Sequence, residues 1–443
     1  MSGIKRDILR IAGPAVSGYV SLIVYELVDI FWIAKLGTET VAGVAAAEYW
    51  TWAMHAIMGM TTIGCATLVA QSIGARDEEG ARTAARESAH LSLLVSAALA
   101  VTIYLSAPAL LRWMGLSPQA HTAGWTYLRI LVLSLPLLYL IHWANQIFNA
   151  HGDTKTAVLI MAVALTVNAG MDPVLIFGWW GFPAMGVAGA AAATVLGWTT
   201  GLLLRVVFLR RRGYIAPLGT YLKFSAGYFG RILKVGVPTG ASHLIWTSVY
   251  PLLTTLITRF GMAPLAGMTI GHRLESMAYF TSVGFSVATA TLVGQAVGRG
   301  DFETARRTTY ESRKLITLIL LPVCVAFVFF PEALLGIATK DPDTIAHGAS
   351  YLRKIGLLEI FLGWEMVFEG GFNGLGSTRP YMYISIPLTL GRYPLSYLLV
   401  AVLGFGVDAI WWCISVTTLL KGVLMSRAFA RARAADLGVR RGI

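Results

Sequence analysis

The stretch TLVAQSIGARD at residues 67–77 recurs as TLVGQAVGRGD at residues 291–301, a shift of 224 positions from 67 to 291. Across residues 67–88, 11 of the 22 shifted positions are identical, and no gap is needed. The same shift places Pro14 on Pro238. Solenoid repeats have periods of about 20–50 residues, far shorter than half of this chain. The sequence therefore predicts an internal duplication in which each half is a complete folding unit.

The composition is that of a polytopic membrane protein. Of 443 residues, 56% are hydrophobic and 13% are charged, whereas soluble domains average about 25% charged residues. Apolar runs long enough to span a bilayer recur along the whole chain. Lys5 and Arg6 precede the first run without a cleavage site, which predicts an uncleaved first span. Cys65, Cys324 and Cys413 lie in separate apolar runs, so neither a disulfide framework nor a metal motif is expected.

The apolar runs predict an all-α fold of twelve transmembrane helices. The expected ranges are 10–35, 48–72, 89–111, 122–148, 155–178, 183–209, 231–258, 270–297, 312–336, 346–372, 380–404 and 405–428. With six helices in each half, both halves enter the membrane from the same side, as parallel repeats do. The expected divisions are an N-lobe at 1–209, a linker at 210–230, a C-lobe at 231–428 and a basic tail at 429–443.

The positions of the basic residues predict the orientation. Most of the 35 Lys and Arg residues lie at the two termini and in the loops after even-numbered helices, densest from Arg210 to Lys234. By the positive-inside rule these flanks are cytoplasmic, so we expect an inner-membrane protein with both termini in the cytoplasm. Topology and attraction to anionic lipid explain the net charge of +12, and nucleic acid is not an expected partner. A monomer is expected.

Two acids lie at depths where a charge is expensive, Asp29 in the first helix and Asp172 in the fifth. An ionisable group there costs about 2.5–3.5 kcal/mol on insertion scales. Asn168 lies one turn before Asp172, and Pro173 lacks the N–H that would pair with the carbonyl of Ala169. Carboxylate, amide and free carbonyl oxygens on one helix face form a ligand set suited to a small cation.

If Asp29 and Asp172 face one pocket, they can share a proton or hold a sodium ion. The alternative for each is a helix cap or an interhelical hydrogen bond. The shift of 224 places Leu253 and Ser396 at the corresponding positions of the second half. Because the second half repeats the scaffold without the acids, we expect function to reside in the N-terminal half.

Other polar residues are weaker candidates for lining a substrate cavity. Glu26 lies one turn before the acid of the first helix, and Asn145 aligns with Glu369 under the shift. Tyr127 and Thr194 could instead be ordinary interhelical hydrogen-bond partners. Nucleotide-binding, zinc-protease and nucleophile-elbow motifs are missing from the sequence. We therefore expect a protein that is not an enzyme, needs no cofactor and draws its energy from an ion gradient.

Three motifs in order resemble the multidrug and toxin extrusion (MATE) transporter family, across essentially the whole chain. The first is LVAQ at 68–71 followed by Gly74 and Ala75, with its copy in the second half. The second is FNAHGDTKT at 148–156. The third is Asn168 and the pair Asp172-Pro173, followed by GVAGAA at 186–191.

The resemblance implies two six-helix lobes in a V around a central cleft, working by alternating access. It implies export of cationic or amphipathic drugs or metabolites in exchange for H⁺ or Na⁺. It also implies an ion or proton coupling site formed by Asp29, Asn168, Asp172 and Thr194, the first three of which could hold Na⁺. Tyr127 and Asn145 are similar to residues of the family's N-lobe cavity.

One subgroup of the family has an acid in helix 7 and an aspartate in helix 10. Here the range 231–258 holds no acid and helix 10 offers only glutamates, so the chain is more similar to the DinF-like branch, with its site in the N-lobe. A flippase for lipid-linked saccharides of the same superfamily is one alternative. The few basic residues inside spans, Arg112, Arg129 and Arg392, argue against it. A passive channel or scaffold is the other alternative, and the paired acids argue against that.

Overall fold

The computed structural model describes residues 3–222, 224–225 and 227–432. Within these residues every regular element is helical, which confirms the expected all-α fold. The chain packs as two compact units, Ser17–Val237 and Met1–Val16 together with Pro238–Ile443. We call Ser17–Val237 the first unit and the remainder the second unit.

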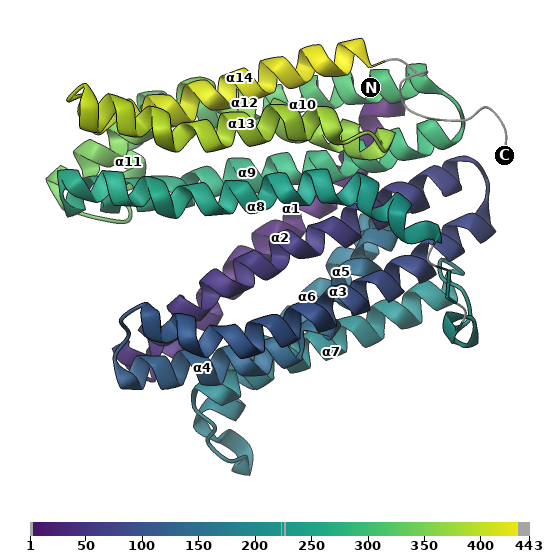
Figure 1. Cartoon of the computed structure of the whole chain (residues 1–443), viewed down its shortest axis with the longest axis horizontal. Coiled ribbons are helices and arrows are strands. Elements are labelled where there is room, and N and C mark those ends of the chain that lie inside the picture. Colours follow the sequence, from purple (N-terminus) through teal and green to yellow (C-terminus); the bar gives the residue numbers. More distant parts are fainter. Residues whose placement is uncertain (1–2, 223, 226, 433–443) are drawn as a thin grey trace. The chain divides into compact units, whose positions relative to one another are not determined.

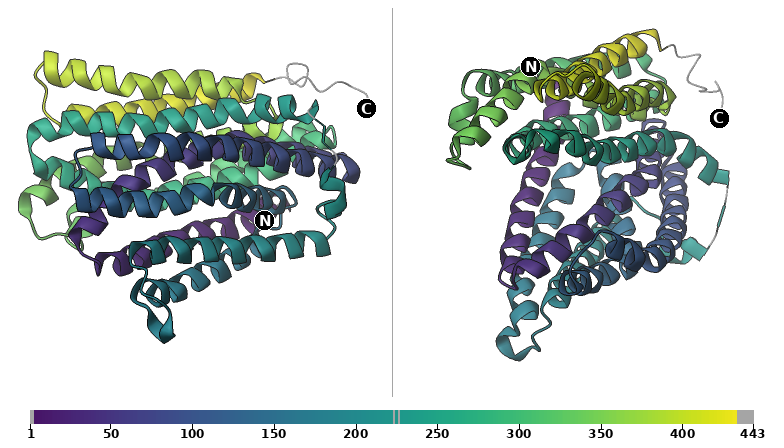
Figure 2. Two further views of the ribbon diagram at one scale, coloured as in Figure 1. Left: turned by 60° about the horizontal axis from the view of Figure 1, so that its bottom comes forward. Right: turned by 60° about the vertical axis from the view of Figure 1, so that its left-hand side comes forward.

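The first unit contains most of the helices of the N-terminal half (Figure 1). Its elements are α1 (Gly3–Ala34, from Ser17 onward), α2 (Thr38–Gly74), α3 (Glu78–Trp113), α4 (Pro118–Leu133), α5 (Leu135–Ala150), α6 (Thr154–Phe177), η1 (Trp179–Gly181), α7 (Val187–Arg211) and η2 (Leu218–Leu222). The connection at residues 178–186 protrudes beyond the ends of α6 and α7 (Figures 1 and 2). At its tip Trp180 has a left-handed backbone (φ 58°) and is 83% exposed.

The second unit contains the helices of the C-terminal half. Its elements are α8 (Gly227–Ile257, from Pro238 onward), η3 (Thr258–Phe260), α9 (Met262–Gly298), α10 (Phe302–Phe329), α11 (Pro331–Leu335), α12 (Pro342–Leu375), α13 (Arg379–Tyr397), the π segment η4 (Leu398–Val402) and α14 (Asp408–Arg431). The helix α12 lies against α9, α10 and α14. It can approach α9 closely because Gly370 and Gly374 have no side chain where a Cβ would meet the carbonyl oxygens of Ser286 and Ala290.

The described helices include enough apolar spans for a polytopic membrane protein. Eight of them are long and apolar enough to cross a bilayer, and the bent pair α4 and α5 makes up to nine. The remaining three expected spans correspond to α8, α12 and α13. These are helical, but they are less apolar or contain more charged residues than the other nine. Polar residues inside these three helices account for the difference.

Several helix ends differ from those expected from hydropathy. The helices α3 and α10 begin at Glu78 and Phe302, rather than at 89 and 312. Their first turns are rich in charged residues, so they lie outside any apolar run. They are nevertheless helical because Asp77 and Asp301 accept hydrogen bonds from the first free N–H groups. The helices α2 and α9 likewise begin earlier than 48 and 270.

The expected fourth span, 122–148, is bent rather than continuous. The structure has two helices, α4 and α5, which meet at Ser134 with a bend of 54°. Pro136 causes the break, because its ring cannot donate to the carbonyl one turn earlier and clashes with it. The expected helix 312–336 is similarly interrupted, since α10 ends at Phe329 and Pro331 begins α11.

The boundaries of the compact units fall inside helices. They divide α1 after Val16 and α8 after Val237, whereas the lobes expected from sequence are 1–209 and 231–428. Residues 433–443, most of the expected basic tail at 429–443, lie outside the described residues. In the described residues of the connection after α7, the regular element is the short helix η2, and α8 begins at Gly227.

Candidate functional site

The four residues expected to form a coupling site are all buried in the first unit. Asp29 lies on α1, Asn168 and Asp172 on α6, and Thr194 on α7. Asp172 is fully buried and Asp29 is 8% exposed. Because Asn168 and Asp172 are one turn apart, their side chains share one face of α6.

Close helix packing brings these side chains together. The Asn168 amide Nδ2 donates to the Thr194 hydroxyl at 3.3 Å, and that hydroxyl donates to the Ala190 carbonyl at 3.1 Å. Gly197 makes this contact possible, since a Cβ there would stand 2.9 Å from the Asn168 Cβ. From α1, the Tyr25 hydroxyl reaches Thr194, which brings that helix to the same place. The helices α1, α6 and α7 thus meet around one polar cluster.

The cluster is rich in acceptors and poor in donors. Asp29 Oδ1, Asn168 Oδ1 and both carboxylate oxygens of Asp172 are buried without a hydrogen-bond partner in the described part of the chain. Asp172 lies within electrostatic range of Asp29, so the two carboxylates would repel each other if both were charged. Buried polar atoms in native proteins are nearly always paired, so four unpaired acceptors in one place need an explanation. A proton or a small cation would satisfy them.

Two tyrosines complete the surroundings of the acids. The Tyr25 hydroxyl interacts with Thr194, and Tyr25 also lies in the electrostatic field of both aspartates. Tyr127, on α4, is buried and lies in the same field. Tyr127 was a sequence candidate, whereas Tyr25 was missed. Its spacing of four residues from Asp29 on one helix face is the signal that could have found it.

The other cavity candidates differ in how near they lie to this cluster. Glu26 is exposed on α1, one turn before Asp29, and acts on it electrostatically. Asn145 is half-buried on α5. Glu369 belongs to the second unit, where it pairs with His243 at 3.1 Å. The structure thus brings Glu26 near Asp29, whereas no interaction of Asn145 or Glu369 with the paired aspartates is found among the described residues.

Buried cations are more numerous than the sequence suggested. Arg112 and Arg129 are exposed, but Arg205, Arg392 and Lys421 are buried. Lys421 on α14 pairs with Glu365 on α12 at 2.7 Å, and Arg392 donates to two threonines of α14. Neither Arg205 nor Lys421 was among the basic residues expected inside spans, and each is buried within a helix, α7 and α14 respectively.

The cluster offers two carboxylates and one amide rather than a site for a transition metal. In the described residues no group of three or more His, Cys, Asp or Glu side chains is placed to hold a metal ion. Hard oxygen donors of this kind suit H⁺ or Na⁺ better than zinc or copper.

Comparison with known proteins places the chain in a family. The MatE family profile matches residues 14–174 and again residues 238–398. The second match begins 224 positions after the first, the same shift that relates the two halves of the sequence. Together the two matches cover most of the chain, and they confirm the internal duplication.

Curated relatives are similar over nearly the whole length. The probable multidrug resistance protein NorM of Thermotoga maritima is 26% identical over 416 residues, covering 92% of this chain and 88% of that protein. A FAD transporter of Shewanella oneidensis is 24% identical over 424 residues, covering 95% and 93%. The solved structure of a MOP superfamily transporter from Pyrococcus furiosus covers 99% of both chains with a TM-score of 0.89 and 24% identity, which shows a shared fold. The chain therefore belongs to the MatE family of membrane transporters.

Proposed function

We propose that this transporter is a secondary active antiporter of the inner membrane, which exports organic solutes in exchange for H⁺ or Na⁺. The observation that carries the proposal is the buried cluster of four unpaired acceptor oxygens on α1 and α6. The site would be loaded from an ion gradient, since the sequence contains no nucleotide-binding loop.

The coupling would work through charge. With no ion bound, Asp29 and Asp172 repel each other in a region shielded from water. Binding of H⁺ or Na⁺ removes that repulsion and lets α1 settle against α6. Antiport requires the solute and the ion to favour different conformations, so that each weakens the binding of the other.

The expected substrates are cationic or amphipathic compounds, either drugs or metabolites. The name of the Thermotoga maritima relative supports drug export. The relative from Shewanella oneidensis is named for FAD, which is anionic. Substrate charge within this family is therefore not uniform, and an anionic dye belongs in the assay beside a cationic one.

Transport by purified protein in proteoliposomes tests the proposal. We would follow a fluorescent lipophilic cation under an imposed pH gradient and, separately, an imposed sodium gradient. Uphill movement under one gradient identifies the coupling ion. Asp29→Asn and Asp172→Asn are expected to abolish uphill movement, while Asp7→Asn, which removes an acid near the start of α1, should leave it intact.

The result that would overturn the proposal is equally definite. If neither gradient drives uphill movement of either dye, the protein is not an antiporter of such solutes. The flippase and channel alternatives then become the hypotheses to test. If uphill movement occurs but persists in both aspartate variants, the coupling site lies elsewhere.

A further inference from the structure

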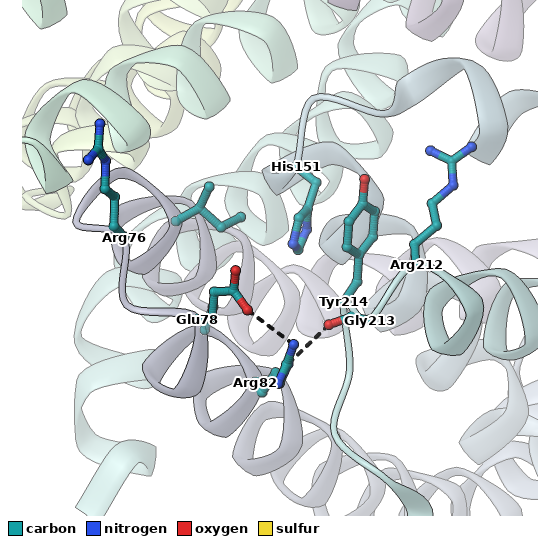
Figure 3. A pocket seen from close by; sticks show the side chains of 9 residues that line it. Arg76, Glu78, Arg82, His151, Arg212, Gly213 and Tyr214 are labelled. Atoms are coloured by element: carbon teal, nitrogen blue, oxygen red, sulfur yellow. Dashed lines mark hydrogen bonds and ion pairs between the residues drawn. The ribbon is translucent and has the colours of Figure 1, made fainter.

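We propose that a basic pocket in the first unit, separate from the paired aspartates, binds the phosphate group of an anionic ligand. The pocket has a volume of about 390 Å³. It lies at the helix ends where the α2–α3 turn, the α5–α6 turn and the chain after α7 come together (Figure 3). Its polar lining consists of Arg76, Glu78, Arg82, His151, Arg212 and Tyr214.

Two of the arginines are held in place by neighbours. Arg82 donates through Nε to the Gly213 carbonyl at 3.0 Å and through a terminal nitrogen to Glu78 at 3.2 Å. Arg212 forms an ion pair with Asp153 and donates to the Thr156 hydroxyl at 3.0 Å. A guanidinium has five N–H donors, so these contacts orient both arginines and leave donors for a further acceptor.

A flat aromatic pair lies between the arginines. The rings of His151 and Tyr214 stack with centroids 3.6 Å apart and an angle of 16° between their planes. Figure 3 shows this pair at the centre, with Arg82 near Glu78 and the Gly213 carbonyl, and with Arg76 and Arg212 on opposite sides. Burial lowers the pKa of His151 below its ordinary value of 6.5, so the ring is neutral at pH 7. The positive charge of the pocket therefore comes from its arginines.

Arg76 has a backbone conformation that arginine disfavours. Its φ is 60°, in the left-handed region, where a side chain clashes with its own backbone. The corresponding residue of the second half is Gly300, with φ 74°, and glycine adopts this conformation without strain. The first half thus keeps an arginine at a position where its own repeat has glycine. Strain retained at one position is a reason to look for a function of the side chain.

The Arg76 side chain is exposed, and no hydrogen bond or ion pair of it is found among the described residues. Three arginines line or border the pocket, against two acids, Glu78 and Asp153. The pocket therefore has one net positive charge. That charge matches a phosphodiester, which has one negative charge, and arginine is well suited to phosphate geometry.

The position of the pocket favours a lipid headgroup as the source of the phosphate. Basic pockets at the ends of transmembrane helices bind anionic headgroups. The volume of about 390 Å³ is also in the usual range for small-molecule sites, roughly 300–1,000 Å³, rather than that of a bare ion. A soluble phosphate ester shares the same chemistry and is the second possible source.

Native mass spectrometry of the full chain in a neutral detergent would measure binding of phosphatidylglycerol and, as a zwitterionic comparison, phosphatidylcholine. Glycerol 3-phosphate and inorganic phosphate form the soluble arm. We expect phosphatidylglycerol to bind at least about tenfold more tightly than phosphatidylcholine, because the choline cation of phosphatidylcholine offsets the charge of its phosphate and is repelled by the arginines. Binding of phosphatidylglycerol without glycerol 3-phosphate identifies a lipid site, and displacement of the lipid by glycerol 3-phosphate identifies a soluble ligand.

Variants separate binding from folding. Arg76→Gly and Arg76→Gln should each weaken phosphatidylglycerol binding roughly tenfold. Only Arg76→Gly should raise the melting temperature of the ligand-free protein, because it also removes the backbone strain. The matched control is Arg211→Gln, which removes an exposed arginine from the same end of α7 but not from the pocket.

Three outcomes would overturn the proposal. One is equal affinity for the two lipids in the wild-type protein. Another is unchanged binding in both Arg76 variants. The third is an equal loss of binding in Arg211→Gln, which would mean attraction to general surface charge. None of these outcomes bears on ion coupling, so the proposed phosphate site can be refuted or supported independently of the proposed antiport.

Discussion

Gly197 of α7 and Asn168 of α6 are so close that a Cβ at position 197 would lie 2.9 Å from the Asn168 Cβ and 3.0 Å from the Ala164 carbonyl oxygen. Transmembrane helices use such small residues to approach closely in lipid. Here the approach has a chemical purpose as well, because it places the Asn168 amide within hydrogen-bonding distance of Thr194.

Replacing Gly197 with alanine should therefore damage both stability and transport. The added methyl group must push α6 away, at a cost typical of overpacking, about 1–3 kcal/mol. The matched control is Gly170→Ala on α6 itself, where a Cβ would meet nothing within 4 Å. Melting temperature and transport rate in the same preparations check this. Equal behaviour of the two variants would contradict the role given to Gly197.

Thr194→Val should weaken binding of the coupling ion without unfolding the protein. Valine has nearly the shape of threonine but no hydroxyl, so the Asn168 amide loses its acceptor and Tyr25 loses a polar contact. The ion concentration for half-maximal transport should rise about tenfold, as expected for a buried hydrogen bond. Thr194→Ser keeps the hydroxyl and should restore the wild-type value. A serine variant as defective as the valine variant would point to packing instead.

The buried pair of Lys421 and Glu365 should be strongly coupled. Their side chains are almost completely buried and 2.7 Å apart. Lys421→Met leaves an unpaired buried carboxylate, which typically costs about 3–5 kcal/mol. The double variant with Glu365→Leu should recover most of that loss, because no charge remains unpaired. A double-mutant cycle on melting in detergent measures the coupling.

An ion pair with an exposed lysine provides the control for this cycle. The Lys314 side chain is 59% exposed and lies 2.9 Å from Glu311, which is 15% exposed and also pairs with Lys5, so its carboxylate keeps a partner when Lys314 is replaced. Pairs of this kind contribute about 0–1 kcal/mol, so Lys314→Met should change stability little. If Lys314→Met and Lys421→Met lose similar amounts of stability, burial is not the reason why the Lys421–Glu365 pair matters.

Acid should destabilise the start of α10 through Asp301. This carboxylate caps the helix, and its hydrogen bonds from the side chain and backbone of Thr304 hold its pKa below the ordinary 3.8. A depressed pKa adds stability above about pH 4, and that stability is lost as the pH falls through the folded-state value.

Asp301→Asn tests this directly, because asparagine is also a good N-cap but does not titrate. The variant should resemble the wild type near pH 7 and lose less stability between about pH 5 and pH 3. Glu303→Gln, an acid in the same first turn, is the control. Identical acid profiles of Asp301→Asn and the wild type would rule out the effect.

Hydropathy could predict which segments are helical but not where the helices end. A hydropathy window detects residues that are stable in lipid, and the first turns of α3 and α10 are charged. Those turns form because a capping aspartate precedes each one, a signal that depends on a single residue. The bend at Ser134 had a visible cause in Pro136, but proline alone does not tell whether a helix will break, since α6 is one continuous helix through Pro173.

The candidate site was accessible from sequence to the extent that its members follow local rules. Asn168 and Asp172 are one turn apart, and acids such as Asp29 stand out in an apolar run. The pairing of Lys421 with Glu365 could not be predicted in the same way, because it joins α14 to α12. Which residue meets which across two helices depends on rotation and register, and neither is fixed by spacing along one chain.

The helices α1 and α8 are each divided between the two compact units. The start of α1, through Val16, packs in the second unit, where Ile8 and Ile11 join a core with Phe285. The start of α8, through Val237, packs in the first unit. Each half of the sequence therefore lends the beginning of its first helix to the other half, in a reciprocal exchange. This is the arrangement of a domain-swapped dimer whose two copies became joined end to end. The segment that repeats in the sequence is thus not the body that folds together, and a single half of this chain would lack part of the core into which the start of its first helix packs.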